Sequence, residues 1–163
     1  MFKNKNILIT GVGKGIGKEL LIKCIQKNYF VYGICRSKSD FKGLEKYKKN
    51  SIILFGDVTN EKFIKSTFSY FKKKNIYFKG LVNNAGERQR VEFNKLNKKN
   101  LFHIFNTNFF SIVDITQKFI NHNKKNKTNL SVVNIGSIVG HRGFLHLSGY
   151  ASTKSALEGL TKS

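Results

Sequence analysis

Five short apolar runs alternate along this chain with segments of helical periodicity. Each run is continuously apolar, as expected for strands that are buried on both faces of a parallel sheet. The runs span residues 6–10, 29–35, 51–55, 79–84 and 130–136. This alternation predicts an α/β fold, in which a doubly wound, Rossmann-like parallel sheet of five strands forms a single domain over residues 1–163.

The segments between the runs predict the helices. Asn60 or Thr59 can cap a helix in which Ile64, Phe68 and Phe71 follow each other at helical spacing. A long stripe of apolar side chains that also contains Asn108 predicts one helix over 97–122, followed by a polar loop over 121–129. Further helices are predicted over residues 15–27, 41–47 and 149–163.

A glycine-rich stretch, TGVGKGIG over residues 10–17, joins the first predicted strand to the first predicted helix. Glycines at this turn let the backbone approach a pyrophosphate, and the helix N-terminus offers free N–H groups to it. The phosphate-loop pattern GxxxxGK(S/T) fails, because Glu19 follows Lys18 and Val12 stands where the first glycine is required. The stretch therefore favours a dinucleotide over ATP or GTP.

The end of the second predicted strand indicates which dinucleotide binds. An NAD site usually places an acid there to accept hydrogen bonds from the ribose hydroxyls, but this sequence has Arg36 and no acid before Asp40. A guanidinium suits the 2′-phosphate of NADP, and Lys14 adds a second cation. We expect NADP(H) to be preferred, and NAD(H) remains open.

Six motifs in order resemble the single-domain branch of the short-chain dehydrogenase/reductase family, over the whole length of the chain. They are the glycine stretch, GDVT after the third strand, NNAG over 83–86, the helical Asn108, Ser137, and YASTK with Tyr150 and Lys154. The resemblance implies a site for NADP(H) or NAD(H). Its cofactor-binding residues are Thr10, Gly11, Lys14, Gly15, Ile16, Gly17, Arg36, Asp57, Val58, Asn84, Ala85, Gly86, Tyr150 and Lys154.

The resemblance also implies a catalytic set made of Asn108, Ser137, Tyr150 and Lys154. Tyr150 and Lys154 have the spacing of one helical turn, and a nearby ammonium lowers the pKa of a tyrosine toward neutrality. Tyr150 is then the general acid or base, Ser137 binds the substrate oxygen, and Asn108 holds a water. The implied reaction is hydride transfer between nicotinamide and a small-molecule carbonyl compound or secondary alcohol, with a 3-oxoacyl thioester as the first expectation.

The chain ends soon after these residues, at Ser163. The strands, the Pro-Gly turn and the substrate loop that follow in the family have no counterpart here. We therefore expect a C-terminally truncated member, in which the fifth strand is an exposed edge. A homo-oligomer is expected for the full-length parent, and a non-catalytic dinucleotide-binding remnant is the alternative function.

Composition bounds the remaining possibilities. The formal net charge is +21, but the lysines are spread along the chain without a nucleic-acid-binding motif, which disfavours a nucleic-acid partner. Cys24 and Cys35 are too few for a disulfide framework and indicate a reducing, cytoplasmic location. The four histidines show no metal-ligand spacing, and the longest apolar run is too short to span a membrane.

Overall fold

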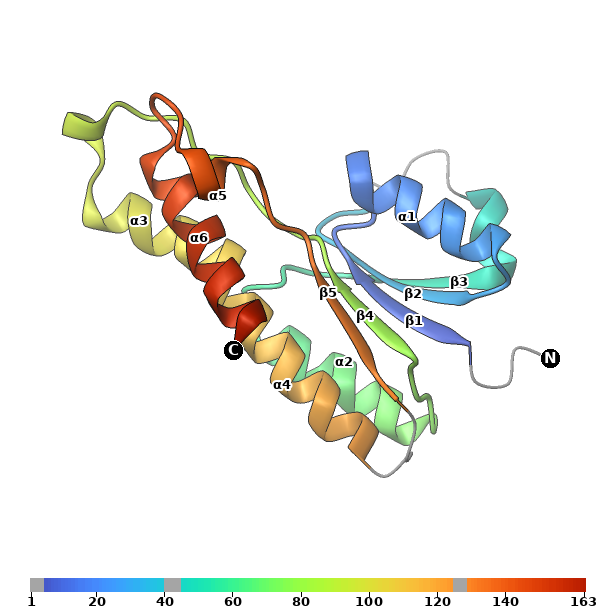
Figure 1. The fold of residues 1–163 in the computed structure, drawn as a ribbon. Helices are drawn as coiled ribbons and strands as arrows, with labels where there is room; N and C mark the ends of the chain where they lie inside the picture. Colours follow the sequence, from blue (N-terminus) through green and yellow to red (C-terminus); the bar gives the residue numbers. More distant parts are fainter. Residues whose placement is uncertain (1–4, 40–44, 125–128) are drawn as a thin grey trace.

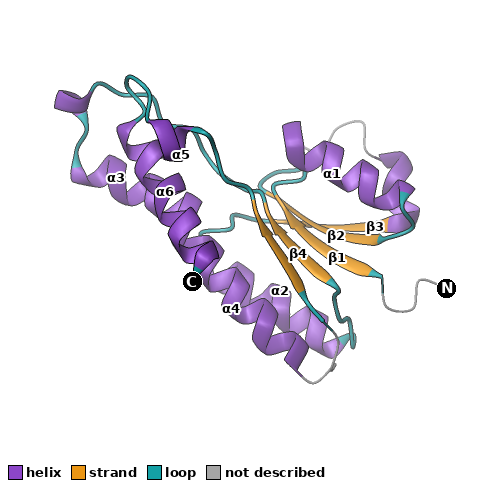
Figure 2. Ribbon diagram, viewed as in Figure 1, coloured by secondary structure: helices purple, strands orange, loops and turns teal. Residues whose placement is uncertain are grey.

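The five apolar runs form one parallel sheet in the computed structural model, which describes residues 5–39, 45–124 and 129–163. The sheet order is β3-β2-β1-β4-β5, and each neighbouring pair is parallel (Figures 1 and 2). The predicted α/β class and the five strands are thereby confirmed. The strands are β1 Asn6–Thr10, β2 Phe30–Cys35, β3 Ser51–Phe55, β4 Gly80–Asn83 and β5 Ser131–Asn134.

Helices cover both faces of this sheet. Figure 2 shows α1 on one side of the strands, with α2 and α4 on the other. The α-helices are α1 Gly15–Gln26, α2 Glu61–Lys73, α3 Lys98–Phe105, α4 Ser111–Asn123, α5 Val139–Arg142 and α6 Ser148–Lys162. There are also two short 3₁₀ helices, Glu45–Asn50 and Phe93–Lys95.

Several predicted helix boundaries need correction. The helix predicted over 97–122 is divided, because a π-helical turn, Asn106–Phe110, separates α3 from α4. Helix α4 then continues to Asn123, into the predicted loop, of which residues 125–128 lie outside the described residues. Residues 41–44 of the helix predicted over 41–47 also lie outside them, and the remainder begins a 3₁₀ helix rather than an α-helix. Helix α5 and the 3₁₀ helix Phe93–Lys95 were not predicted.

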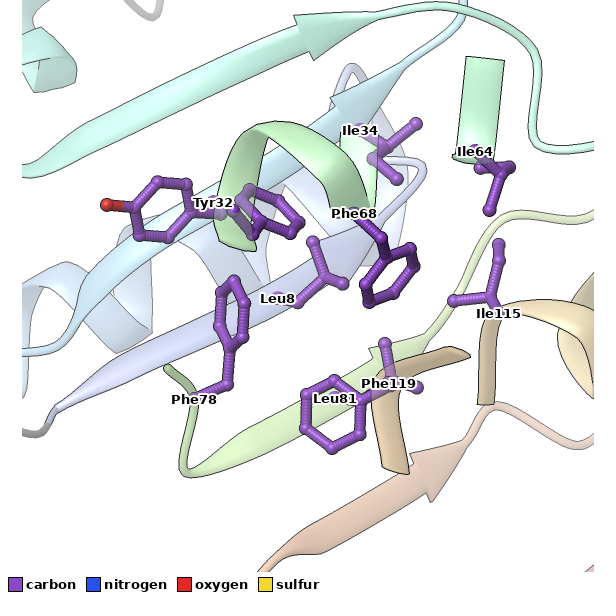
Figure 3. Close-up of a cluster of buried hydrophobic side chains, with 10 residues drawn as sticks. Leu8, Tyr32, Ile34, Ile64, Phe68, Phe78, Leu81, Ile115 and Phe119 are labelled. Atoms are coloured by element: carbon purple, nitrogen blue, oxygen red, sulfur yellow. The ribbon is translucent and has the colours of Figure 1, made fainter. Parts of the chain in front are cut away.

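Two apolar clusters fill the space between the sheet and its helices. Successive strand residues face opposite sides of a sheet, so Leu8 belongs to one cluster and Ile9 to the other. The larger cluster contains Ile64 of α2 and Phe119 of α4 (Figure 3). Its aromatic centre is tight, with ring centroids 4.9 Å apart for Phe71 and Phe78. The predicted stripe of α2 is therefore the face that anchors this helix to the sheet.

Polar side chains fix where the helices begin and end. The Asn60 side chain accepts a hydrogen bond from the backbone N–H of Phe63, which confirms the predicted cap of α2. At the end of α4, the side chain of Asn123 accepts a hydrogen bond of 2.8 Å from the backbone N–H of Phe78, just before β4. The first contact fixes the start of α2, and the second joins the end of α4 to the segment that enters β4.

The strand order reverses direction between β1 and β4. From β1 the chain first adds β2 and β3 on one side, and then crosses to add β4 and β5 on the other. The loops that leave β1 and β4 therefore diverge, and ligands of such sheets bind in the crevice between them. At the far edge, Val133 of β5 is 49% exposed, and the described residues pair β5 with β4 on one side only.

Candidate functional site

A polar cleft of about 770 Å³ lies at this crevice, at the carboxyl ends of the strands. Four cationic side chains line it together with two carboxylates, which suits an anionic ligand. Twelve of the predicted site residues line the cleft: Gly11, Lys14, Ile16, Arg36, Asp57, Val58, Asn84, Ala85, Gly86, Ser137, Tyr150 and Lys154. Sequence reasoning missed further lining residues, among them Gly13, Glu87, Arg88, Thr107 and Ile135.

The glycine stretch forms a tight turn between β1 and α1. Gly11 has a φ of +73°, which favours glycine, and its N–H donates a hydrogen bond of 2.8 Å to the carbonyl of Ile34. A Cβ on Gly17 would stand 2.0 Å from the carbonyl oxygen of Gly11, so α1 can approach the turn only with glycine there. Gly17 and Gly15 are not among the lining residues of the cleft; they shape the turn behind it.

The ends of β1 and β4 are joined by hydrogen bonds. The buried hydroxyl oxygen of Thr10 accepts bonds from the backbone N–H groups of Asn84 and Ala85, at 3.0 and 2.9 Å. The side-chain amide of Asn84 donates in return to the carbonyls of Thr10 and Gly11, at 2.9 and 3.0 Å. Thr10 is thus a structural tie rather than a cleft-lining group, and Asn84 serves both purposes.

The N-terminus of α1 opens beside the cleft. Within the described part of the chain, no side chain caps this terminus, and its first turn contains no acidic residue. Its N–H groups and the positive end of the helix dipole thus stay available to an anion. The flanking residue Lys14 is exposed and lines the cleft. Small residues, free N–H groups and cations together fit the pyrophosphate of a dinucleotide.

Arg36 extends from the end of β2 and meets an acid on the other side of the cleft. Its Nη1 donates a hydrogen bond of 3.0 Å to Oε1 of Glu87, which follows NNAG after β4. The other carboxylate oxygen of Glu87 lies 2.8 Å from Nε2 of His103. The signal that could have identified Glu87 is an acid placed directly after a cofactor motif.

Asp57 lies shortly after β3, in a turn that its side chain closes with Thr59. Its Oδ1 accepts hydrogen bonds from the backbone N–H and the hydroxyl of Thr59, at 2.8 and 2.7 Å. Such a turn fixes the direction in which the chain leaves the strand. Asp57 and Val58 line the cleft on the same side as Arg36, where the sequence predicts the adenosine half of the cofactor.

Helix α6 places Tyr150 and Lys154 in the cleft at its opposite side. Lys154 is 7% exposed, and this burial lowers the pKa of its amine from the ordinary value. Its Nζ donates a hydrogen bond of 2.6 Å to the carbonyl of Ile135 and lies 5.9 Å from the centre of the Tyr150 ring. Ser137, after β5, lines the same cleft, and its oxygen accepts a hydrogen bond of 3.2 Å from the N–H of Val139.

Asn108 lies behind the cleft, inside the π-helical turn. Its side chain is 0% exposed and is not among the cleft-lining groups. The amide oxygen accepts a 2.8 Å bond from the N–H of Glu87, and the amide nitrogen donates to the carbonyl of Glu87 at 2.9 Å and to the hydroxyl of Thr153 at 3.2 Å. The side chain therefore clamps the backbone that follows NNAG to α6, while its predicted role of holding a water stays a prediction.

A second hollow of about 330 Å³ lies over α3 and the π-helical turn, lined by Lys98 and four apolar side chains. Functional pockets combine apolar walls with several convergent polar groups, and this hollow has a single lysine. It is therefore not the candidate site. Among the helices of the described residues, none has the length and apolar character that a membrane crossing requires.

Comparison with known proteins gives consistent matches. The family described as short chain dehydrogenase matches residues 5–163. An uncharacterized oxidoreductase of Saccharomyces cerevisiae is 33% identical over 94% of this chain and 61% of its own length. A 3-oxoacyl-(acyl-carrier-protein) reductase of Buchnera aphidicola is 28% identical over 99% of this chain and 66% of its own length. The chain thus spans about two thirds of these relatives.

A solved structure agrees with the fold. The protein ElxO, determined with NADP bound, superimposes with a TM-score of 0.87 at 30% sequence identity. The superposition covers 96% of this chain and 65% of ElxO.

Proposed function

The chain belongs to the short-chain dehydrogenase family, and from this membership we propose that it is an NADP(H)-dependent oxidoreductase acting on a carbonyl compound or secondary alcohol. One observation carries the proposal. Ser137, Tyr150 and Lys154 line the same cleft as the glycine turn and Arg36, although they lie far apart in the sequence. A cofactor held at the turn and a substrate held at the serine would share this cleft.

The proposed chemistry divides among three side chains. Tyr150 donates a proton to the carbonyl oxygen in reduction and removes it in oxidation, as a positioned general acid or base. Lys154 lies near the Tyr150 ring and stabilises the phenolate form when it is charged. Ser137 donates a hydrogen bond to the oxygen on which negative charge develops. A bound nicotinamide supplies or accepts the hydride.

NADP(H) is the proposed cofactor. Arg36 and Lys14 line the cleft, and a guanidinium binds a phosphate with paired donors. ElxO, which is 30% identical, has NADP bound. Asn108 is proposed as a positioning residue that holds the loop after NNAG, because both of its amide atoms contact the backbone of Glu87.

The substrate class and the cellular setting are proposed from similarity and composition. A 3-oxoacyl thioester is the first substrate to test, because the Buchnera reductase shares 28% identity. The chain has two cysteines, Cys24 and Cys35, which are too few for a disulfide framework, and on this ground we propose a reducing cytoplasmic location. A homo-oligomeric assembly remains our expectation.

The decisive experiment on catalysis is the variant Tyr150→Phe. We expect turnover of a 3-oxoacyl thioester to fall by about 10²- to 10⁴-fold, because the proton donor is lost, while NADPH affinity stays within about twofold of the wild type. The absorbance of reduced nicotinamide reports turnover, and its fluorescence reports binding. Undiminished turnover in Tyr150→Phe would refute the assigned acid. Binding without turnover in the wild type would favour the non-catalytic remnant.

A further inference from the structure

Glu87 occupies a charged position in the cleft that the proposed chemistry does not use. Its side chain connects the two sides of the cleft, since Oε1 accepts from Arg36 at 3.0 Å and Oε2 lies 2.8 Å from His103. Arg36 follows β2, whereas Glu87 follows β4, on opposite sides of β1. The cation expected to receive a 2′-phosphate is therefore already paired with a carboxylate.

The position of Glu87 is fixed at four atoms. Its backbone N–H donates to Asn108 at 2.8 Å, and its carbonyl accepts from the same amide at 2.9 Å. Because His103 holds one carboxylate oxygen, the other is directed toward Arg36. A freely rotating surface glutamate can leave its partner at little cost. The Glu87 side chain is 36% exposed and has two partners, so its carboxylate stays near Arg36, although Arg36 and His103 are themselves 62% and 67% exposed.

Charge then determines the effect on cofactor choice. A 2′-phosphate brought to Arg36 approaches a negative carboxylate, and it must either displace Glu87 or bind beside it. A bare ribose hydroxyl carries no such charge and can even donate to a carboxylate. Glu87 is thus expected to weaken the binding of NADP(H) and to leave that of NAD(H) almost unchanged.

We propose that Glu87 is a specificity-determining residue that limits the preference for NADP(H) by partly neutralising Arg36. The inference rests on the proposed function, because it requires a dinucleotide in the cleft. It differs from the roles assigned to Arg36 and Lys14, which both favour the phosphate. The relative affinity for the two cofactors is then a balance between Arg36 and Glu87.

The variant Glu87→Gln tests this directly. The amide keeps the size of the side chain and the backbone contacts to Asn108, so the fold should persist. Exposed ion pairs contribute up to about 1 kcal/mol, which corresponds to about fivefold in affinity. We expect NADPH to bind about two- to fivefold more tightly than to the wild type, measured by fluorescence titration, with NADH unchanged. The matched control is Glu92→Gln, which removes the same charge from a pair with Lys95 that does not line the cleft.

A double variant tests whether Glu87 acts through Arg36. In Arg36→Met, the change Glu87→Gln should no longer alter the ratio of the two affinities, because the cation through which Glu87 acts is gone. An unchanged or lower NADPH-to-NADH preference in Glu87→Gln would overturn the inference, and so would an effect that persists in Arg36→Met. Wild-type protein that binds neither cofactor would instead reject the proposed function, and the inference with it.

Discussion

Burial of the Lys154 amine in the candidate site lowers the stability of the folded chain. This amine is buried between β5 and α6, and desolvation lowers its pKa below the ordinary lysine value of 10.5. The hydrogen bond to the Ile135 carbonyl orients this amine beside Tyr150. A charge placed there costs folding free energy, and the proposed chemistry explains why the chain retains it.

This cost predicts a pH dependence. Because the pKa of Lys154 is lower in the folded state, the unfolded chain binds more protons than the folded chain at pH values approaching 10.5. The free energy of unfolding therefore increases with pH in that window. We expect the free energy of unfolding of the wild type, relative to Lys154→Met, to increase from neutral pH into this window. Urea unfolding of both proteins at several pH values measures it. The exposed Lys99→Met is the control, and an equal slope for both lysine variants would contradict the prediction.

The sequence indicates the relative placement of residues best where their spacing along the chain defines it. The spacing of Tyr150 and Lys154, and the glycines after β1, follow from local geometry alone. Glu87 could not be predicted in the same way, because its partner Arg36 is 51 residues away and only the fold brings them together. The apolar stripe indicates that Asn108 is buried, but its hydrogen-bond partners, the backbone of Glu87 and the hydroxyl of Thr153, could not be predicted because they lie 21 and 45 residues away.

At the scale of elements, strands were easier to predict than helix interruptions. The runs that form β1 and β3 match their predicted bounds, because buried parallel strands are marked by continuous apolar sequence. The π-helical turn has no such signal: Ile104, Asn108 and Ile112 are all buried as the single predicted helix requires. Such turns are frequent at functional sites, and this one places the amide that clamps Glu87.

The junction of β1 and α1 gives a prediction at this scale. In Gly17→Ala the new Cβ would stand 2.0 Å from a backbone oxygen, so α1 must shift away from the turn. We expect a loss of about 1–3 kcal/mol in the free energy of unfolding, the usual cost of overpacking, and much weaker dinucleotide binding. Gly159→Ala in α6 has open space around the added atom and should instead stabilise by about 0.5–1 kcal/mol through helix propensity. Equal effects of the two changes, in an unfolding titration, would count against this explanation.

At the scale of the whole molecule, the order of the strands explains why distant motifs meet. The reversal between β1 and β4 brings together the glycine turn, Arg36, NNAG and the helix of Tyr150. The alternation of elements predicted the doubly wound class, but the pairing of β1 with both β2 and β4 is a property of the folded sheet. The formal charge of +21 bears on this site through the four cationic side chains that line the cleft together with two carboxylates.

The most direct test of the central claim, that this cleft is an NADP(H) site, is an equilibrium titration of the purified chain with NADPH and with NADH. Saturable binding of both is predicted, with NADPH bound more tightly because Arg36 and Lys14 line the cleft and a guanidinium suits a 2′-phosphate. In Arg36→Asp the preference should shift toward NADH by about 1–3 kcal/mol, the usual strength of charge-assisted bonds. Equal affinities in the wild type, tighter binding of NADH, or no binding of either cofactor would contradict the claim.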